Sequence, residues 1–107
     1  MRRYDESIEV RKGLIGALEG PAQFLWRRKL WQVTEVQTRW VETADWWNSP
    51  LIRAARGDLE EVAARALLAE EEIWRVVAAP GRAGEPGVYE LAHAWADGAW
   101  RLRAVVD

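Results

Sequence analysis

Residues that make and break bonds in enzymes are scarce in this sequence. His93 is the only histidine, Ser7 and Ser49 are the only serines, and there is no cysteine. A catalytic histidine needs a nucleophile and an orienting acid nearby, and a zinc ion needs several converging His, Cys or carboxylate ligands. We therefore interpret His93 as a structural residue hydrogen-bonded near the core, and predict no catalytic residue, metal or cofactor.

Carboxylates and glycines are more numerous, but their spacing indicates no reaction. The main acidic runs are Glu60-Glu61 and Glu70-Glu71-Glu72, and runs of this kind usually form a solvated face. Gly13-Leu14-Ile15-Gly16 lacks the lysine and the following helix of a phosphate-binding loop. These patterns favour a non-enzymatic protein that works by binding.

Aromatic and basic side chains offer one candidate binding surface. The chain has 8 tryptophans, and one pair of them flanks three consecutive cations. Small β domains often hold single-stranded nucleic acid by stacking bases on aromatic rings beside cations. The predicted surface consists of Trp26, Arg27, Arg28, Lys29, Trp31, Arg101 and Arg103. In the alternative interpretation, Trp26 and Trp31 belong to the core, and Glu90 and the acidic residues of a predicted helix cover Arg101 and Arg103.

Trp40, Trp46 and Trp47 form a second aromatic cluster. Neighbouring residues of an extended chain point to opposite faces, so Trp46 and Trp47 are not both buried in a strand. An exposed tryptophan at a strand end is a candidate anchor for a protein partner. Either this cluster binds such a partner, or a helix folds over it.

Composition and charge fit a small globular domain. The 107 residues are 50% apolar and 30% charged, which allows a single core. The net charge of −2 combines +3 over residues 1–57 with −5 over residues 58–107, so nucleic acid would have to use a local basic patch. No apolar run resembles a signal peptide or a membrane span, and the lack of cysteine fits a reducing compartment. We expect a cytoplasmic location.

Hydrophobic alternation and turn residues predict about six antiparallel strands. A loop is expected where Gly13, Gly16, Gly20 and Pro21 gather. The second and third predicted strands form a hairpin with a charged tip, and an extension of the third strand to Val41 is expected. The predicted strands cover residues 6–11, 22–26, 30–36, 73–78, 88–95 and 100–106.

One inserted helix is predicted near residues 58–70. Asp58 is a suitable N-cap, and Glu61 follows it at the spacing of a capping box. Glu70-Glu71-Glu72 ends this helix, although acidic residues there oppose the helix dipole. The predicted fold is mainly β (α+β), a small curled sheet or half-barrel. It forms a single domain over residues 1–107, with a helical insertion at about 50–71.

Asp97-Gly98 predicts a type I′ turn between the last two strands. This register pairs Trp95 with Trp100, His93 with Leu102, Leu91 with Ala104 and Tyr89 with Val106 on one apolar face. The opposite face carries Glu90, Ala92, Ala94, Arg101 and Arg103. An open interior would leave a small-molecule pocket around His93, Tyr89 and Trp95.

Several segments carry a family resemblance. They are residues 3–10 (RYDESIEV), 21–27 (PAQFLWR), 39–42 (RWVE) with Trp46-Trp47, 72–76 (EIWRV), 87–91 (GVYEL), 93–95 (HAW) and 100–102 (WRL). In these segments the chain resembles a small uncharacterised bacterial family, a domain of unknown function common in actinobacteria. Its members look like stand-alone proteins often encoded near Y-family translesion DNA polymerases. The resemblance implies a link to DNA-damage tolerance, and it supplies no activity or functional residue.

Together these observations predict an accessory domain that binds a protein partner, such as a translesion polymerase, through Trp40, Trp46 and Trp47. Single-stranded nucleic-acid binding through the Trp/Arg surface is the alternative, and a small-molecule pocket is the second alternative. The oligomeric state does not follow from the sequence.

Overall fold

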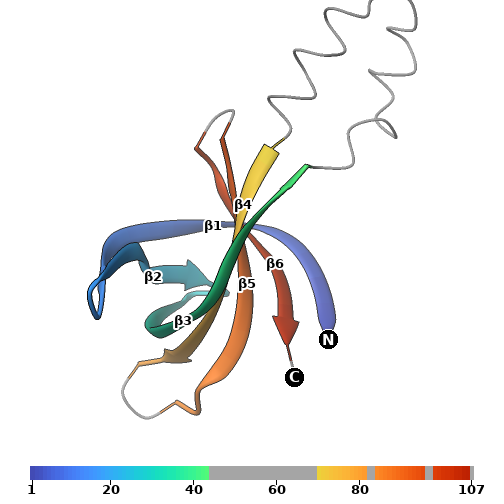
Figure 1. The fold of residues 1–107 in the computed structure, drawn as a ribbon. Coiled ribbons are helices and arrows are strands. Elements are labelled where there is room, and N and C mark those ends of the chain that lie inside the picture. The colour runs from blue at the N-terminus through green and yellow to red at the C-terminus, as the bar shows by residue number, and fades with distance from the viewer. Residues whose placement is uncertain (44–69, 82–83, 96–97, 107) are drawn as a thin grey trace, which may run out of the picture.

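The computed structural model describes residues 1–43, 70–81, 84–95 and 98–106. These residues form six strands and no helix, and Figure 1 shows how the strands are arranged. The strands are β1 (Arg2–Ile15), β2 (Leu18–Trp26), β3 (Lys29–Thr43), β4 (Glu70–Pro80), β5 (Gly87–Ala94) and β6 (Trp100–Val106). The described part of the chain thus confirms the mainly β class, and it offers no helix suited to crossing a membrane.

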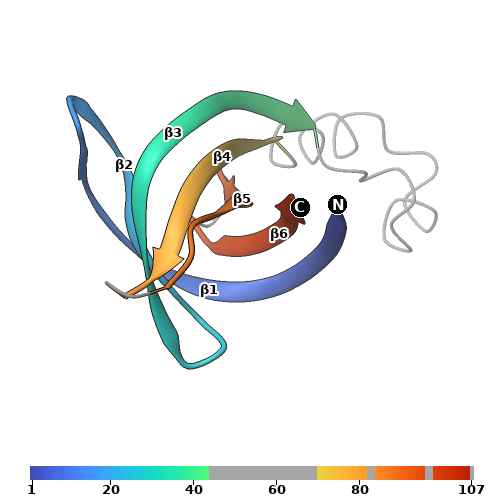
Figure 2. The same ribbon diagram turned by 90° about the horizontal axis from the view of Figure 1, so that it is seen from below.

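The six strands form one antiparallel sheet that closes on itself. Each strand pairs with the next, and β6 returns to pair with β1. Two long strands make closure possible because each pairs with different neighbours at its two ends. β1 pairs with β6 over residues 2–8 and with β2 over residues 9–15. β3 pairs with β2 over residues 29–32 and with β4 over residues 31–43. Figure 2 shows the strong curvature of both strands.

The inner face of this ring is filled by an aromatic and aliphatic core. Phe24, Trp26, Trp31 and Tyr89 form its centre, with ring centroids 5.1–6.2 Å apart. Around them pack Ile15, Val33, Trp74, Val76, Ala78, Leu91 and Leu102. Rings of this size dominate the buried area of a small core, so the interior of the sheet is packed with side chains.

The prediction of a glycine-rich loop between the first two strands is wrong. β1 continues to Ile15, the chain turns at Gly16 with φ of 63°, and Gly20 and Pro21 are buried inside β2. Gly20 is required for space, because a Cβ there would lie 2.7 Å from Cζ3 of Trp74. The glycine therefore allows close packing between β2 and β4 and does not mark a break in the chain.

The β2–β3 hairpin has the predicted position and an unexpected turn. Trp26 pairs with Lys29, and the two central residues, Arg27 and Arg28, have φ of 51° and 64°. A two-residue turn with both residues left-handed is the type I′ geometry, which normally uses Asn and Gly. Arg27 is held there by its guanidinium, which lies 4.6 Å from the Trp26 ring centroid.

The predicted helix near 58–70 lies outside the described residues except for its last residue, Glu70. Glu70-Glu71-Glu72 does not end a helix, because these residues begin strand β4. In the strand they alternate between two environments. Glu71 is buried against Arg101, while Glu72 accepts a hydrogen bond from Nε1 of Trp74 at 2.6 Å. Both glutamates have partners in the sheet, which the acidic run alone did not reveal.

The predicted β5–β6 register is also wrong. His93 pairs with Trp100 and Leu91 with Leu102, so the connection is longer than a two-residue turn. A bulge between Glu90 and Leu91 shifts the register again, and Tyr89 pairs with Val105. Near the turn, Leu91 pairs with Leu102 in place of the predicted Ala104. This displacement is an even number of residues, so Leu91 and Leu102 still face the core. Trp95 falls outside the ladder and is 51% exposed.

We predict that Arg28→Gly stabilises the protein by up to about 1 kcal/mol, because glycine adopts a left-handed conformation without steric cost. Equilibrium urea unfolding would measure the change. The matched control is Lys29→Gly, which places glycine in a strand and should destabilise. Equal losses of stability in the two variants would contradict the assignment of the turn.

Candidate functional site

The tip of the β2–β3 hairpin holds most of the predicted nucleic-acid surface, but its tryptophans are packed inward. Trp26 is 9% exposed, and its Nε1 donates a hydrogen bond to Oε2 of Glu6. Nε1 of Trp31 donates to the carbonyl oxygen of Trp26 at 3.2 Å. The hairpin thus matches the alternative in which both indoles belong to the core. Its exposed cations are Arg27, Arg28 and Lys29.

Arg27 is partly engaged within the protein. Its guanidinium lies 5.1 Å from the Tyr4 ring centroid and over the Trp26 ring, and its Nη2 lies 3.7 Å from Oε1 of Glu6. Cation–π contacts of this type contribute about 0.5–1 kcal/mol at exposed sites. The other two cations of the tip, Arg28 and Lys29, are exposed.

Arg101 and Arg103 do not join the hairpin tip. They lie in a charged cluster on the face of the sheet opposite the aromatic core, since Glu71 and Arg75 alternate with the core residues Trp74 and Val76 along β4. We define the charged cluster as Asp5, Glu42, Glu71, Arg75, Glu90, Arg101 and Arg103. These residues come from β1, β3, β4, β5 and β6.

Arg101 bridges two carboxylates of this cluster. Its Nη1 donates to Oδ1 of Asp5 at 2.8 Å, and its Nη2 donates to both carboxylate oxygens of Glu71 at 2.6 and 2.8 Å. Burial alone would lower the pKa of Arg101, but the hydrogen bonds and negative charges of Glu71 and Asp5 outweigh it and raise that pKa. Arg101 is therefore a permanently charged link between β1, β4 and β6.

Glu90 and Glu42 neutralise the other arginines. The buried Glu90 accepts two hydrogen bonds from Arg75, at 2.9 and 3.2 Å, and lies 3.9 Å from Nε of Arg103. Nη1 of Arg103 is 2.7 Å from Oε2 of Glu42, a close ion pair without hydrogen-bond geometry. Burial on its own would raise the pKa of Glu42, but a hydrogen bond from Trp40 and the charges of Arg103 and Arg3 lower it.

The charged cluster is electrostatically balanced and does not resemble a phosphate-binding patch. Each of its arginines has a carboxylate within 3 Å. Phosphate binding relies on cations that are free to replace counterions, and these guanidinium groups already have acidic partners. The predicted polar face of Glu90, Arg101 and Arg103 was a usable signal for the cluster. Glu71 was missed because its run was assigned to a helix end.

Of the predicted protein-binding tryptophans, the structure describes only Trp40. It is partly buried, and its Nε1 donates to Oε1 of Glu42 at 2.8 Å, so it borders the charged cluster. Trp46 and Trp47 lie outside the described residues. The structure thus supplies no common surface for these three residues.

The residues of the predicted small-molecule pocket are also separated. Tyr89 is buried in the aromatic core, whereas His93 and Trp95 lie at one end of the ring. His93 stacks on Trp100 with centroids 4.3 Å apart and an interplanar angle of 9°. Among the described residues, no group of three or more His, Cys, Asp or Glu side chains is arranged to hold a metal ion.

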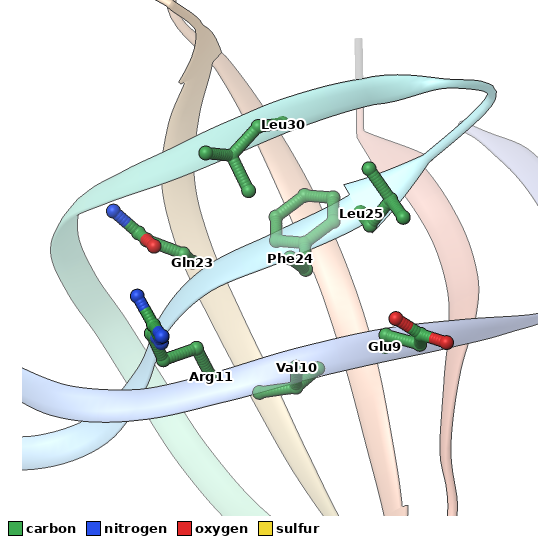
Figure 3. Close-up of a pocket in the computed structure, with 7 residues that line it drawn as sticks. All are labelled: Glu9, Val10, Arg11, Gln23, Phe24, Leu25 and Leu30. Atoms are coloured by element: carbon green, nitrogen blue, oxygen red, sulfur yellow. The ribbon is translucent and has the colours of Figure 1, made fainter.

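An apolar surface that the sequence did not reveal lies on the outside of the β2–β3 hairpin. Leu25 and Leu30 pair directly across the two strands and are 44% and 48% exposed. Figure 3 shows them beside residues of β1, around a shallow pocket of about 290 Å³. The pocket is lined by Glu9, Val10, Arg11, Gln23, Phe24, Leu25 and Leu30. We call these seven residues, together with Arg28 and Lys29, the hairpin surface.

A second apolar hollow continues the hairpin surface. It is lined by Lys29, Leu30, Pro80, Gly81 and Gly84. Leu30 lines both hollows, so they adjoin at this side chain. Strand alternation contained a signal for this surface: once Trp26 and Trp31 face the core, their neighbours Leu25 and Leu30 must face outward.

Comparison with known proteins identifies the family. A model of the domain of unknown function DUF6504 matches residues 1–107. The chain belongs to the DUF6504 family. No curated protein and no solved structure matches it. The expected resemblance to an uncharacterised family is therefore confirmed for the DUF6504 domain.

We predict that Glu90→Gln lowers the free energy of unfolding by about 1–3 kcal/mol, because it removes the buried charge that faces two arginines. Urea unfolding at neutral pH would measure the loss. Glu35→Gln changes an exposed carboxylate on β3 and should have little effect. An equally small effect of Glu90→Gln would show that the charged cluster adds nothing to stability.

Glu42 should add acid sensitivity to the fold. Its pKa is lowered from the ordinary 4.5, so its contribution is present above that value and is lost as pH falls through the lower folded-state pKa. The stability advantage of the wild type over Glu42→Gln should therefore be constant from neutral pH down to the ordinary value of 4.5, and it should shrink as the pH falls below that value. Urea unfolding of both proteins across this range tests the point, and a difference independent of pH would refute it.

Proposed function

We propose that this DUF6504 domain is a non-enzymatic accessory module that binds a protein partner through the hairpin surface. The main support for this proposal is that Leu25 and Leu30 pair directly across the two strands, are exposed, and lie beside two adjoining apolar hollows. Exposed apolar groups that line a hollow with a polar rim are typical of protein interaction sites. The hollow of about 290 Å³ is large enough to accept a bulky apolar side chain.

The charges around the leucines support an acidic partner segment. Arg11, Arg28 and Lys29 are exposed, while Glu9 is the acidic residue that lines the pocket. Opposite charges on the two sides of an interface steer association and suppress wrong partners. The proposed occupant is therefore a peptide segment that carries one or two bulky apolar side chains among aspartates and glutamates.

The family resemblance suggests which partner to test first. Its implied association with Y-family translesion polymerases makes such a polymerase, from the same genome, the first candidate. A role in DNA-damage tolerance would follow if the accessory domain recruits or positions this enzyme. This part of the proposal rests on the resemblance, whereas the surface and its chemistry rest on the described side chains.

Single-stranded nucleic acid has weaker geometric support. Base stacking needs accessible ring faces, but Trp26 is buried and Trp31 packs against Phe24 and Tyr89. Arg101 and Arg103 face carboxylates elsewhere in the sheet. Of the seven residues predicted to bind nucleic acid, Arg28 and Lys29 are the exposed cations that do not stack on the aromatic rings at the tip, and two cations without accessible rings favour a protein partner over a strand of nucleic acid.

We predict that Leu25→Ser with Leu30→Ser weakens polymerase binding by at least about tenfold, because exposed apolar anchors contribute 1 kcal/mol or more each when buried in an interface. Surface plasmon resonance with the purified polymerase and the full chain would measure binding. The fold should persist because both side chains are already half exposed.

The matched control is Leu14→Ser, which removes a leucine that is 74% exposed at the β1–β2 hairpin. Unchanged affinity in this control, with loss in the double variant, would support the hairpin surface. Equal affinity of all three proteins would refute it. Binding of a labelled single-stranded oligonucleotide that weakens steeply with salt would favour the nucleic-acid alternative.

A further inference from the structure

A separate aromatic pocket lies at the end of the ring where the β5–β6 hairpin meets β1, β2 and β4. We call it the rim pocket, and its volume is about 280 Å³. It is lined by Lys12, Glu19, Gly20, Glu72, Trp74, His93, Trp95 and Trp100. None of these residues belongs to the hairpin surface, so the two surfaces can be altered independently.

The aromatic side chains of the rim pocket are held in place by the surrounding structure. Trp100 stacks on His93, which covers one face of its indole. The backbone N–H of Trp95 donates to the carbonyl oxygen of Glu70 at 3.3 Å, which fixes this loop residue to the start of β4. Trp95 is nonetheless 51% exposed, so much of its indole remains accessible to a ligand.

The carboxylates give the rim pocket a negative charge. Glu72 is positioned by Nε1 of Trp74, which donates to its Oε1 at 2.6 Å. Glu19 and Glu72 supply two carboxylates beside the one ammonium group of Lys12, which favours a cation over phosphates and other anions. Aromatic faces beside a carboxylate are the groups that recognise organic cations, through cation–π attraction and charge.

Trp74 already takes part in such an interaction within the protein. The guanidinium of Arg39 lies 4.9 Å from its ring centroid, and Arg39 does not line the rim pocket. The benzo edge of the same indole packs against Gly20. With Trp74 held on these sides, a cation would meet the half-exposed indole of Trp95 and the partly buried indole of Trp100, both of which line the pocket.

We propose that the rim pocket binds an alkylammonium cation. Quaternary ammonium groups fit best, because they combine a positive charge with an apolar methyl surface that suits indole rings. The cation could come from a small metabolite such as choline or from a methylated lysine side chain, since both present the same trimethylammonium group.

Titration of the full chain with choline, followed by NMR of the indole N–H groups, tests this proposal. The expected result is that the Trp74, Trp95 and Trp100 signals move, while those of Trp26 and Trp31, which pack in the aromatic core and do not line the pocket, stay unchanged. The matched ligand is 3,3-dimethyl-1-butanol, the neutral analogue of choline. It should bind roughly three- to thirtyfold more weakly, because it lacks the charge.

Two variants locate the site. Trp95→Ala removes an exposed indole and Glu72→Gln removes a charge, and each should weaken choline binding several-fold, whereas Glu9→Gln on the hairpin surface should not. Unchanged Trp26 and Trp31 signals would show that each variant is folded. Titration with Nα-acetyl-trimethyllysine methyl ester separates the sources: tighter binding than choline indicates a protein side chain, and weaker binding a small metabolite.

Equal binding of choline and its neutral analogue would overturn the proposal, as would the absence of any movement in the three rim-pocket signals. Neither outcome would affect the proposed polymerase contact, because Leu25 and Leu30 lie outside this pocket.

Discussion

Closure of the sheet around Phe24, Trp26, Trp31 and Tyr89 is the constraint from which the other features follow. β1 and β3 must be long enough to pair with one neighbour at each end, and they must bend sharply between the two. The close contact between Gly20 and Trp74 is part of the same requirement. Because strand residues alternate, an aromatic core on one face also determines which side chains face outward.

The charged cluster follows from this alternation on the opposite face. Its ion pairs connect residues of β1, β3, β4, β5 and β6. Partly buried ion pairs offset their own desolvation and add limited net stability. They do discriminate between registers, since a slip of one residue would turn Glu71, Glu90 and Arg101 toward the apolar core.

Much of the sheet could be predicted because local alternation is a reliable guide to strands. β6 has its predicted bounds, and β5 differs by one residue at each end. Long-range causes account for the errors. Gly20 resembled a loop residue because its partner, Trp74, lies far away in sequence, and the bulge at Glu90 left no local pattern.

The candidate site was less predictable than the fold for a related reason. Tryptophan counts and a basic tip favoured an exposed aromatic surface, but the closed ring turns Trp26 and Trp31 inward. The local sequence did not predict that Leu25 and Leu30 are exposed, because a leucine beside a tryptophan is an ordinary feature of a β strand. The exposure of Leu25 and Leu30 can be predicted only once Trp26 and Trp31 are known to face the core.

The pairing of β1 with β6 also constrains the order of events during synthesis. Arg2 pairs with Val105 and Ile8 with Trp100, so one edge of the first strand has no partner in the ring until the sixth strand has left the ribosome. Contacts between such distant segments form slowly, and an unpaired strand edge promotes association with other chains. Charged side chains along an open edge limit such association by opposing the burial of that edge, and Arg2, Arg3, Asp5 and Glu6 place four of them there.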